Sequence, residues 1–348
     1  MKAIVQRSYG GPETLELGDL DRPVVGQNEI LVRVHAASVH LGDSIVMSGS
    51  PLVMRFATGL RKPKNPVPGT DVAGTVEAVG KDVTLHRPGD EVFGWGAGAF
   101  TEYVAAPEDH FVTKPANLTF EQAAAVGVSA TAALQLLRDD GKIQPGQKVL
   151  INGASGGVGT FAVQIAKAFG AEVTGVSSTK NVELVRSIGA DRVIDYTKED
   201  FTKADGRYDL VFDNVGNRSM ARTRRALKPT GLLLSNGGGH AGGKLGRTLR
   251  GMLVSKFVRQ QAAPSVKTPN RADLIALKEL VETGKVRPVI DSTYPLTRTR
   301  EAIARVMTGR ARGTIVVSIL EAPAANAGSG AVSTSAPAAV PTPATTGA

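Results

Sequence analysis

Glycines spaced three apart separate an apolar run from a segment of helical period. The run 149–151 is typical of a buried strand, and Gly153, Gly156 and Gly159 follow it. Apolar residues then recur at helical spacing over 158–169. A strand, a glycine turn and a helix N-terminus can bind phosphate, because glycine admits close backbone approach and the first N–H groups carry partial positive charge.

The glycine spacing differs from the usual dinucleotide fingerprint, since Ala154 stands where the first glycine normally falls. A plain strand–turn–helix connection is therefore the alternative. A second strand pattern at 172–176 follows at the βαβ distance and favours nucleotide binding. The residues expected at the phosphates are Ser155, Gly156, Gly157 and Val158.

The end of the second strand indicates which cofactor binds. Folds that bind NAD usually place Asp or Glu there for the ribose 2′-hydroxyl. Here the strand is followed by hydroxyl residues and Lys180, and no carboxylate appears before Glu183. We expect Ser178 and Lys180 to meet the 2′-phosphate of NADP. The alternative, that these polar residues cap the next helix, is compatible with this role.

Length and composition bound the remaining possibilities. The 348 residues suffice for two domains, and the absence of cysteine excludes disulfides, thiolate catalysis and cysteine-ligated metal. We find no signal-peptide pattern and no apolar run near 18 residues, so a cytoplasmic protein is expected. The net charge is +9, with seven basic and no acidic residues over 244–271. No nucleic-acid motif accompanies that charge, so a nucleic-acid partner is not expected.

Two C-terminal segments have unusual composition. Apolar residues recur at helical spacing over 244–259, with Lys and Arg at other positions. Packing on the protein's own domain is the favoured interpretation, and a membrane-surface helix is the alternative. The segment 322–348 consists of Ala, Pro, Thr, Ser, Gly, Val and one Asn, which predicts a disordered tail.

Six motifs in a fixed order resemble the medium-chain dehydrogenase/reductase superfamily, in its zinc-independent quinone oxidoreductase (zeta-crystallin-like) branch. They lie at 37–43, 69–74, 88–90, 124–127, 153–159 and 189–191. The resemblance implies an α/β fold: a GroES-like β-rich catalytic domain plus a Rossmann domain with a doubly wound parallel sheet. The expected domains are 1–125 with 290–320, and 126–289. We also expect two helices over 118–145, the first capped by Thr119.

The resemblance also assigns further cofactor residues. In the family, the residue at Thr131 faces the nicotinamide, and tyrosine at the position of Tyr196 lies near the 2′-phosphate. A hydroxyl bonded to its own helix is the alternative role for Thr131. The expected carboxyl ends of two later strands add Asn214 and the glycines Gly237 and Gly238, where open α/β sheets bind ligands. A homodimer is also expected.

Zinc is not expected. The positions that hold catalytic zinc in the alcohol dehydrogenases of the family correspond to His40, Thr70 and Val128, and only His40 binds zinc well. The candidate polar groups near a substrate are His40, Asp43 and Tyr103. Asp43 bonded to nearby loop amides in a purely structural role is the alternative.

The absent metal narrows the expected chemistry. Hydride transfer to a simple ketone develops negative charge on oxygen and usually needs a proton donor or Lewis acid. A quinone or an α,β-unsaturated carbonyl spreads that charge by conjugation. The sequence therefore predicts an NADPH-dependent reductase of quinones or enones. A non-catalytic NADPH-binding protein, structural or regulatory, and a zinc-independent alcohol or aldehyde reductase are the alternatives.

Overall fold

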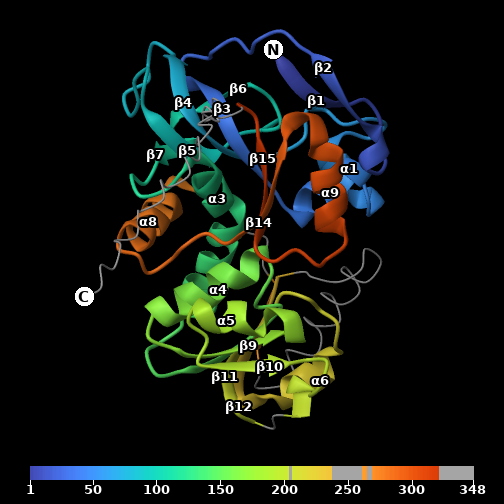
Figure 1. Cartoon of the computed structure of the whole chain (residues 1–348), viewed down its shortest axis with the longest axis vertical. Helices are drawn as coiled ribbons and strands as arrows, with labels where there is room; N and C mark the ends of the chain where they lie inside the picture. Colours follow the sequence, from blue (N-terminus) through green and yellow to red (C-terminus); the bar gives the residue numbers. More distant parts are fainter. Residues whose placement is uncertain (204–205, 237–260, 265–268, 321–348) are drawn as a thin grey trace, which may run out of the picture.

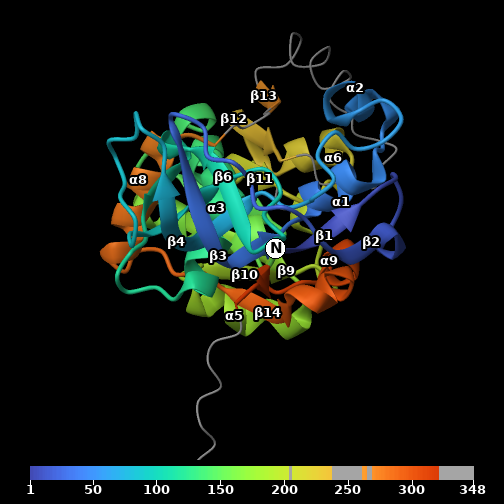
Figure 2. The same cartoon turned by 90° about the horizontal axis from the view of Figure 1, so that it is seen from above.

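Two lobes make up the molecule, each built around one large β-sheet. The computed structural model describes residues 1–203, 206–236, 261–264 and 269–320. One lobe combines elements from the start and the end of the chain, and the other contains the middle of the chain (Figures 1 and 2). The chain therefore leaves the first lobe, forms the second lobe and then returns to the first.

The sheet of the first lobe has seven strands. Its order is β14 (Ile290–Pro295), β15 (Thr314–Ser318), β3 (Glu29–Val39), β4 (Asp71–Val79), β5 (Glu91–Trp95) and β7 (Phe111–Thr113), with β6 (Tyr103–Pro107) paired to β3. The long strand β3 pairs with β6 through its first half and with β15 through its last four residues. Strands β1 (Lys2–Gln6) and β2 (Leu15–Asp19) form a separate antiparallel pair.

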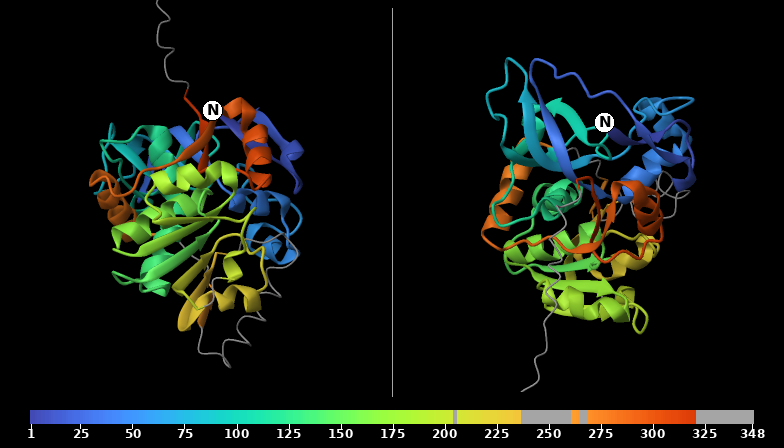
Figure 3. Two further views of the ribbon diagram at one scale, coloured as in Figure 1. Left: turned by 60° about the horizontal axis from the view of Figure 1, so that its bottom comes forward. Right: turned by 45° about the horizontal axis from the view of Figure 1, so that its top comes forward.

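The sheet of the second lobe has six parallel strands. Its order is β10 (Arg192–Asp195), β9 (Glu172–Ser177), β8 (Lys148–Asn152), β11 (Tyr208–Asp213), β12 (Leu227–Ser235) and β13 (Gln261–Pro264). This is the 3-2-1-4-5-6 order of the Rossmann fold, with the order reversing between β8 and β11. Figure 3 shows this sheet from two further directions.

Both faces of the parallel sheet are buried. Val149 and Ile151 of β8 belong to an apolar cluster with α4 (Gly157–Ala168), whereas Leu150 belongs to a second cluster with Phe201. Successive side chains of a strand point to opposite faces, so a strand covered on both sides needs a continuous apolar run. This is why the run 149–151 shows no alternation with polar residues.

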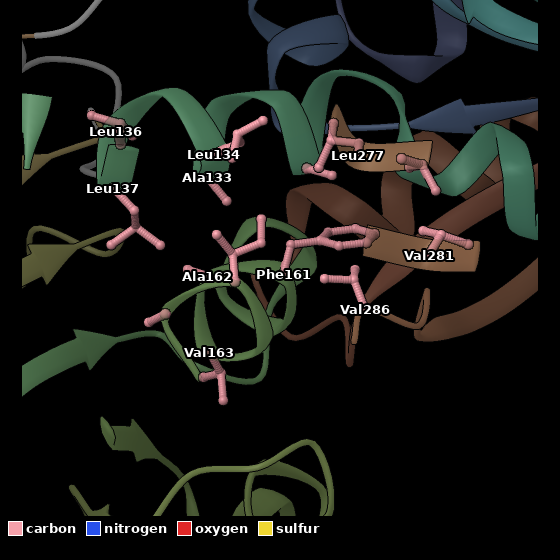
Figure 4. Close-up of a cluster of buried hydrophobic side chains, with 14 of the residues drawn as sticks. Ala133, Leu134, Leu136, Leu137, Phe161, Ala162, Val163, Leu277, Val281 and Val286 are labelled. Carbon is pink, nitrogen blue, oxygen red and sulfur yellow. The ribbon is translucent and has the colours of Figure 1, made fainter. Parts of the chain in front are cut away.

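The other helices surround the two sheets. They are α1 (Leu41–Ser48), α2 (Arg55–Thr58), α3 (Phe120–Gln135), α5 (Val182–Ser187), α6 (Met220–Arg225), α8 (Arg271–Glu282) and α9 (Thr299–Met307). The largest apolar cluster lies where α3, α4 and α8 meet, with Leu134, Phe161 and Leu277 fully buried there (Figure 4). This cluster joins the helix layer of the second lobe to the elements of the first.

The two helices predicted over 118–145 are confirmed. The backbone of α3 (Phe120–Gln135) is non-helical at Gly127 (φ −9°, ψ −121°), so this residue divides the element into two helices. The predicted cap is confirmed, because Thr119 and Gln122 exchange both hydrogen bonds of a capping box. The helix crosses residue 125, so the predicted domain boundary at that point remains a proposal.

The predicted α/β architecture of two domains is confirmed, with a mixed sheet in one lobe and a parallel sheet of Rossmann order in the other. The strands predicted at 149–151 and 172–176 are both present within one or two residues. The stripe at 244–259 and the tail at 322–348 lie outside the described residues.

The glycine turn has one position that requires glycine for packing. An ideal Cβ on Gly159 would lie 2.0 Å from the Gly153 carbonyl oxygen, so the helix approaches the turn as closely as backbone allows. On Gly156 the nearest atom would be 3.6 Å away, and its φ of −85° suits any residue. The left-handed conformation falls instead on Gly153, with φ +85°.

We therefore expect Gly159→Ala to lower the free energy of unfolding by about 2–3 kcal/mol, because the added methyl must displace backbone. The matched variant Gly156→Ala should cost less than about 1 kcal/mol, since its site is open. Urea unfolding of both variants measures the difference. Equal destabilisation would contradict the close approach at Gly159.

Candidate cofactor and substrate site

The candidate phosphate-binding turn is held by contacts from both lobes. Gly156 is the N-cap of α4, and its own N–H donates to Gly153 O at 3.1 Å, so the free N–H groups of the helix begin with Gly157. The carbonyl of Ser155 accepts a hydrogen bond from Gly313 N at 2.9 Å, and its hydroxyl accepts one from Asn181 Nδ2 at 3.0 Å. Gly156 also forms a bridge to Gly313, directly before β15. The turn is thus held against the strand that returns to the first lobe.

Small and hydroxyl residues surround the next position. An ideal Cβ on Gly157 would lie 3.5 Å from Gly313 O, 3.6 Å from Ser129 Oγ and 3.7 Å from Thr314 Oγ1. Val158 packs its side chain against the apolar cluster of the helix layer. Of the four residues predicted at the phosphates, Val158 therefore offers only its backbone.

The three residues predicted at the 2′-phosphate lie at neighbouring strand ends. Ser178 directly follows β9 and is half-buried, and Lys180 is exposed two residues later. Tyr196 directly follows β10, and its backbone N donates to Ser177 O at 3.0 Å. Its side chain is 49% exposed. The structure thus brings hydroxyls and a cation to one edge of the sheet.

An acidic residue missed by the sequence analysis lies at the same edge. Asp195 pairs with Ser177 in the register of β10 and β9. Its carboxylate accepts from Thr179 Oγ1 at 2.6 Å and from Thr197 Oγ1 at 2.7 Å. These bonds, with Thr179 first, lower the pKa of Asp195 and keep it ionised. The sequence analysis could not place Asp195 here, because Asp195 is far from Ser177 in the sequence and only the register of the two strands brings them together.

The carboxyl ends of the central strands hold a polar cluster. Asn214 follows β11, donates its backbone N to Asn152 O at 3.2 Å, and accepts from Asn236 Nδ2 at 2.8 Å. Asn152 of β8 donates to the fully buried Asp213 at 2.8 Å. Asn214 directly follows β11, as predicted, and the structure shows that these residues lie where the strand order reverses. The predicted Gly237 and Gly238 lie outside the described residues.

His40 and Asp43 form one unit at the start of α1. His40 is the N-cap, and its backbone N donates to Asp43 Oδ2 at 2.8 Å. That oxygen lies 3.5 Å from His40 Nδ1. Burial raises the pKa of Asp43. The bond to the cap amide supports the structural role that was the alternative for Asp43. His40 Nε2 is buried without a hydrogen-bond partner among the described residues, so it is available to a ligand.

A second buried carboxylate, Asp71, was not predicted to take part. Its Oδ2 accepts from Ser38 Oγ at 2.5 Å, and its Oδ1 accepts from Val128 N at 2.9 Å. An ideal Cβ on Gly127 would lie 2.3 Å from this carboxylate, so Asp71 fills the kink of α3. Burial raises the pKa of Asp71 to about 6, against the opposing charge of His40. The sequence did offer one indication that Asp71 is important, because it lies within the 69–74 motif.

Two buried threonine hydroxyls, one on α3 and one on β15, have no hydrogen-bond partner in the described part of the chain. They belong to Thr131 of α3, 1% exposed, and Thr314 at the start of β15. The alternative role for Thr131, a hydroxyl bonded to its own helix, does not occur. Thr314 Oγ1 lies near Gly157, so this second hydroxyl stands beside the candidate phosphate turn.

Tyr103 does not join the other candidates, which corrects the prediction that it lies near the substrate. It pairs with Arg33 on β3, seven residues before His40, or about 23 Å along an extended strand. Its hydroxyl accepts from Arg22 Nη2 at 2.9 Å, and the Arg22 guanidinium stacks over its ring at 4.1 Å. The alternation of β6 points this side chain to the outer surface.

The donor set does not fit a zinc ion. Of the three positions, only His40 offers a good ligand atom, and Val128 offers none because its side chain is aliphatic. Among residues 1–203, 206–236, 261–264 and 269–320, no group of three or more His, Cys, Asp or Glu is arranged to hold a metal. No described helix is both long and apolar enough to cross a bilayer.

Comparison with known proteins defines the class. Residues 26–116 match the alcohol dehydrogenase GroES-like domain, and 188–317 match the family described as zinc-binding dehydrogenase. The chain is 35% identical to the human mitochondrial NAD(P)H oxidoreductase RTN4IP1, over 92% of this chain and 89% of that protein. It is 33% identical to the chloroplastic NADPH-dependent alkenal/one oxidoreductase of Arabidopsis thaliana, over 91% and 79%.

A solved structure shares the whole architecture. The quinone oxidoreductase of Escherichia coli, crystallised with NADPH, has a TM-score of 0.78 and 26% identity, covering 92% of this chain and all of that one. Together with the two sheets and the glycine turn, these matches identify an oxidoreductase with a GroES-like and a Rossmann domain. The chain belongs to the medium-chain dehydrogenase/reductase superfamily.

The buried Asp71 predicts a particular pH dependence of stability. Its ordinary pKa is 3.8, and the folded protein raises it to about 6. Between these values the folded state holds a proton that the unfolded state has lost, so stability falls as pH rises through this window. Above it the full cost of the buried charge, about 3 kcal/mol, is present.

Asp71→Asn mimics the protonated form, because an amide can accept from Val128 N and donate to Ser38 Oγ. We expect the variant to be about 1–3 kcal/mol more stable than wild type at neutral pH and similar to it at low pH. Urea unfolding across this range measures the difference between the two proteins. Parallel profiles would show that Asp71 does not titrate in this window.

Proposed function

We propose that the protein is an NADPH-dependent reductase of quinones or α,β-unsaturated carbonyls that works without a catalytic metal. The observation that carries the proposal is the position of α3 between two candidate sites. Val128 N holds Asp71 beside His40, and the next residue, Ser129, adjoins the Gly157 turn. One helix segment thus positions a cofactor turn and a substrate-facing histidine together.

The residues present fit a dinucleotide. The N-terminus of α4 opens at Gly156, where no side chain obstructs a pyrophosphate. The free hydroxyls of Thr131 and Thr314 are buried hydrogen-bonding groups with no partner in the described part of the chain, as expected where a ligand supplies one. Ser178, Lys180 and Tyr196 hold the 2′-phosphate, and Asn214 lines the nicotinamide end. When bound, NADPH supplies a hydride.

The protein's own residues orient the acceptor. His40 Nε2 donates to the carbonyl oxygen of the substrate, and Asp43 fixes the histidine by accepting from the His40 backbone amide. His40 and Asp43 provide no Lewis acid to stabilise the negative charge that develops on the oxygen of a simple ketone. A conjugated acceptor needs this stabilisation less, because it spreads the charge over more atoms. Relatives named as quinone and alkenal/one oxidoreductases support this substrate class.

The remaining proposals concern compartment and assembly. We retain the cytoplasm as the proposed compartment, although two relatives carry mitochondrial and chloroplastic names. We also retain a homodimer, which sedimentation velocity would test. We also propose the division into two domains that the sequence suggested, one formed by 1–125 with 290–320 and the other by 126–289.

Oxidation of NADPH with a panel of quinones, enones and simple ketones tests the proposed activity. We expect turnover with conjugated acceptors in the presence of a chelator, and little with ketones. Gly156→Val is the control: it should fold, because its site is open, but lose NADPH binding because the side chain occupies pyrophosphate space. Binding without turnover of any acceptor would favour the non-catalytic alternative. Ketone turnover would favour the alcohol or aldehyde reductase.

Lys180→Ala should weaken binding of NADPH by about 1–3 kcal/mol and leave NADH nearly unchanged, because only the former has a 2′-phosphate. The matched control is Lys198→Ala at the same sheet edge, whose ammonium lies 3.7 Å from Asp195. Titration calorimetry with both cofactors measures the effect. An equal loss for NADH and NADPH would place the phosphate elsewhere.

A further inference from the structure

Exposed apolar side chains gather on one short segment of the first lobe. The segment contains a 3₁₀ turn, η2 (Leu52–Met54), followed directly by α2. Phe56 is 75% exposed, and the other exposed side chains here are Leu52, Val53 and Leu60. Single apolar residues on a surface are ordinary, but several within one helical turn and its flank form a patch. In Figure 2, α2 lies at the outer edge of the lobe.

The opposite side of the segment is anchored by polar contacts. Tyr9 donates its hydroxyl to Gly59 O at 2.6 Å and lies 2.8 Å from Thr58 Oγ1. The Arg55 guanidinium stacks 4.5 Å above the Tyr9 ring, and its Nε donates to Gly49 O at 3.1 Å. These contacts order the segment without using Leu52 or Phe56. The apolar side chains are therefore not needed to hold the segment in place.

Positive charge adjoins the apolar residues. From Ser44 to Thr70 the chain has four basic residues and no acidic one. Three of them, Arg61, Lys62 and Lys64, are exposed, and none forms an ion pair with any residue that the structure describes. A patch of this composition favours a surface that is both apolar and negatively charged.

We propose that Leu52, Val53, Phe56 and Leu60, together with Arg61, Lys62 and Lys64, form a docking surface for an anionic lipid bilayer. The apolar side chains enter the boundary between headgroups and acyl chains, and the cations meet the anionic headgroups. A second copy of the chain fits less well, because it would bring the same positive charge to the contact.

The position of the surface gives the docking a consequence. The segment follows α1, and α1 begins directly after His40. A reductase held at a membrane in this way reaches apolar quinones or enones that partition into lipid. This consequence rests on the proposed function, whereas the docking does not and is measured without turnover.

Flotation of the full chain with vesicles tests the docking. We expect binding to vesicles of phosphatidylcholine and phosphatidylglycerol in equal parts, little binding to phosphatidylcholine alone, and a loss of binding with added salt. Phe56→Ser should lower the partition coefficient about tenfold. Arg61→Glu should lower it about 30-fold by reversing one charge.

Matched controls separate the patch from the rest of the surface. Val24→Ser removes another highly exposed apolar side chain, at 91% exposure, and Lys81→Glu reverses another exposed cation. Both should bind vesicles as wild type does. Unchanged melting temperature and NADPH affinity would show that the Phe56→Ser variant is folded.

Three results would overturn the proposal. Equal binding to neutral and anionic vesicles, or binding that Phe56→Ser leaves unchanged, would place any membrane contact elsewhere. A wild-type dimer that becomes monomeric in Phe56→Ser, with no vesicle binding, would make the patch an interface between copies. Binding of polyglutamate but not of anionic vesicles would assign the surface to an acidic polypeptide.

Discussion

The buried carboxylate of Asp71 joins the segments that the candidate site depends on. It accepts from Ser38 at the end of β3 and from Val128 beyond the kink of α3, and it belongs to β4. The space it occupies at Gly127 excludes any side chain there. The first half of α3 stacks Phe120 on His35 of β3, and the second half packs on α4 (Figure 4). One ionisable group thus links two strands of the first sheet to the helix that packs on the second lobe.

Local patterns allowed much of the fold to be predicted from the sequence. The continuous run 149–151 indicated a strand buried on both faces, and the change of period at Gly156 located the helix. The Thr119 capping box was readable because its partners are three residues apart. Each of these features depends on neighbours in the sequence, which is why pattern alone sufficed.

Features set by long-range contacts were not predictable in this way. Asp195 comes beside Ser177 only through the register of two parallel strands, and Tyr103 is carried away from His40 by pairing with Arg33. The space beside the kink of α3 at Gly127 is filled by the carboxylate of Asp71, a residue of a distant strand. Likewise, the sequence could not show that His40 Nε2 and Thr131 Oγ1 are buried without a hydrogen-bond partner among the described residues, because this depends on the packing around them.

The pairing of β15 with β3 also bears on the order in which the protein can form during synthesis. Val39 lies near the start of the chain, yet its partner Ile315 is among the last of the described residues. The parallel sheet of the second lobe needs no residue beyond Pro264, so its strands leave the ribosome first. Meanwhile β3 keeps an open hydrogen-bonding edge, the kind of edge that pairs with other chains. We therefore expect the nascent protein to be open to pairing with other chains until its last strand closes that edge.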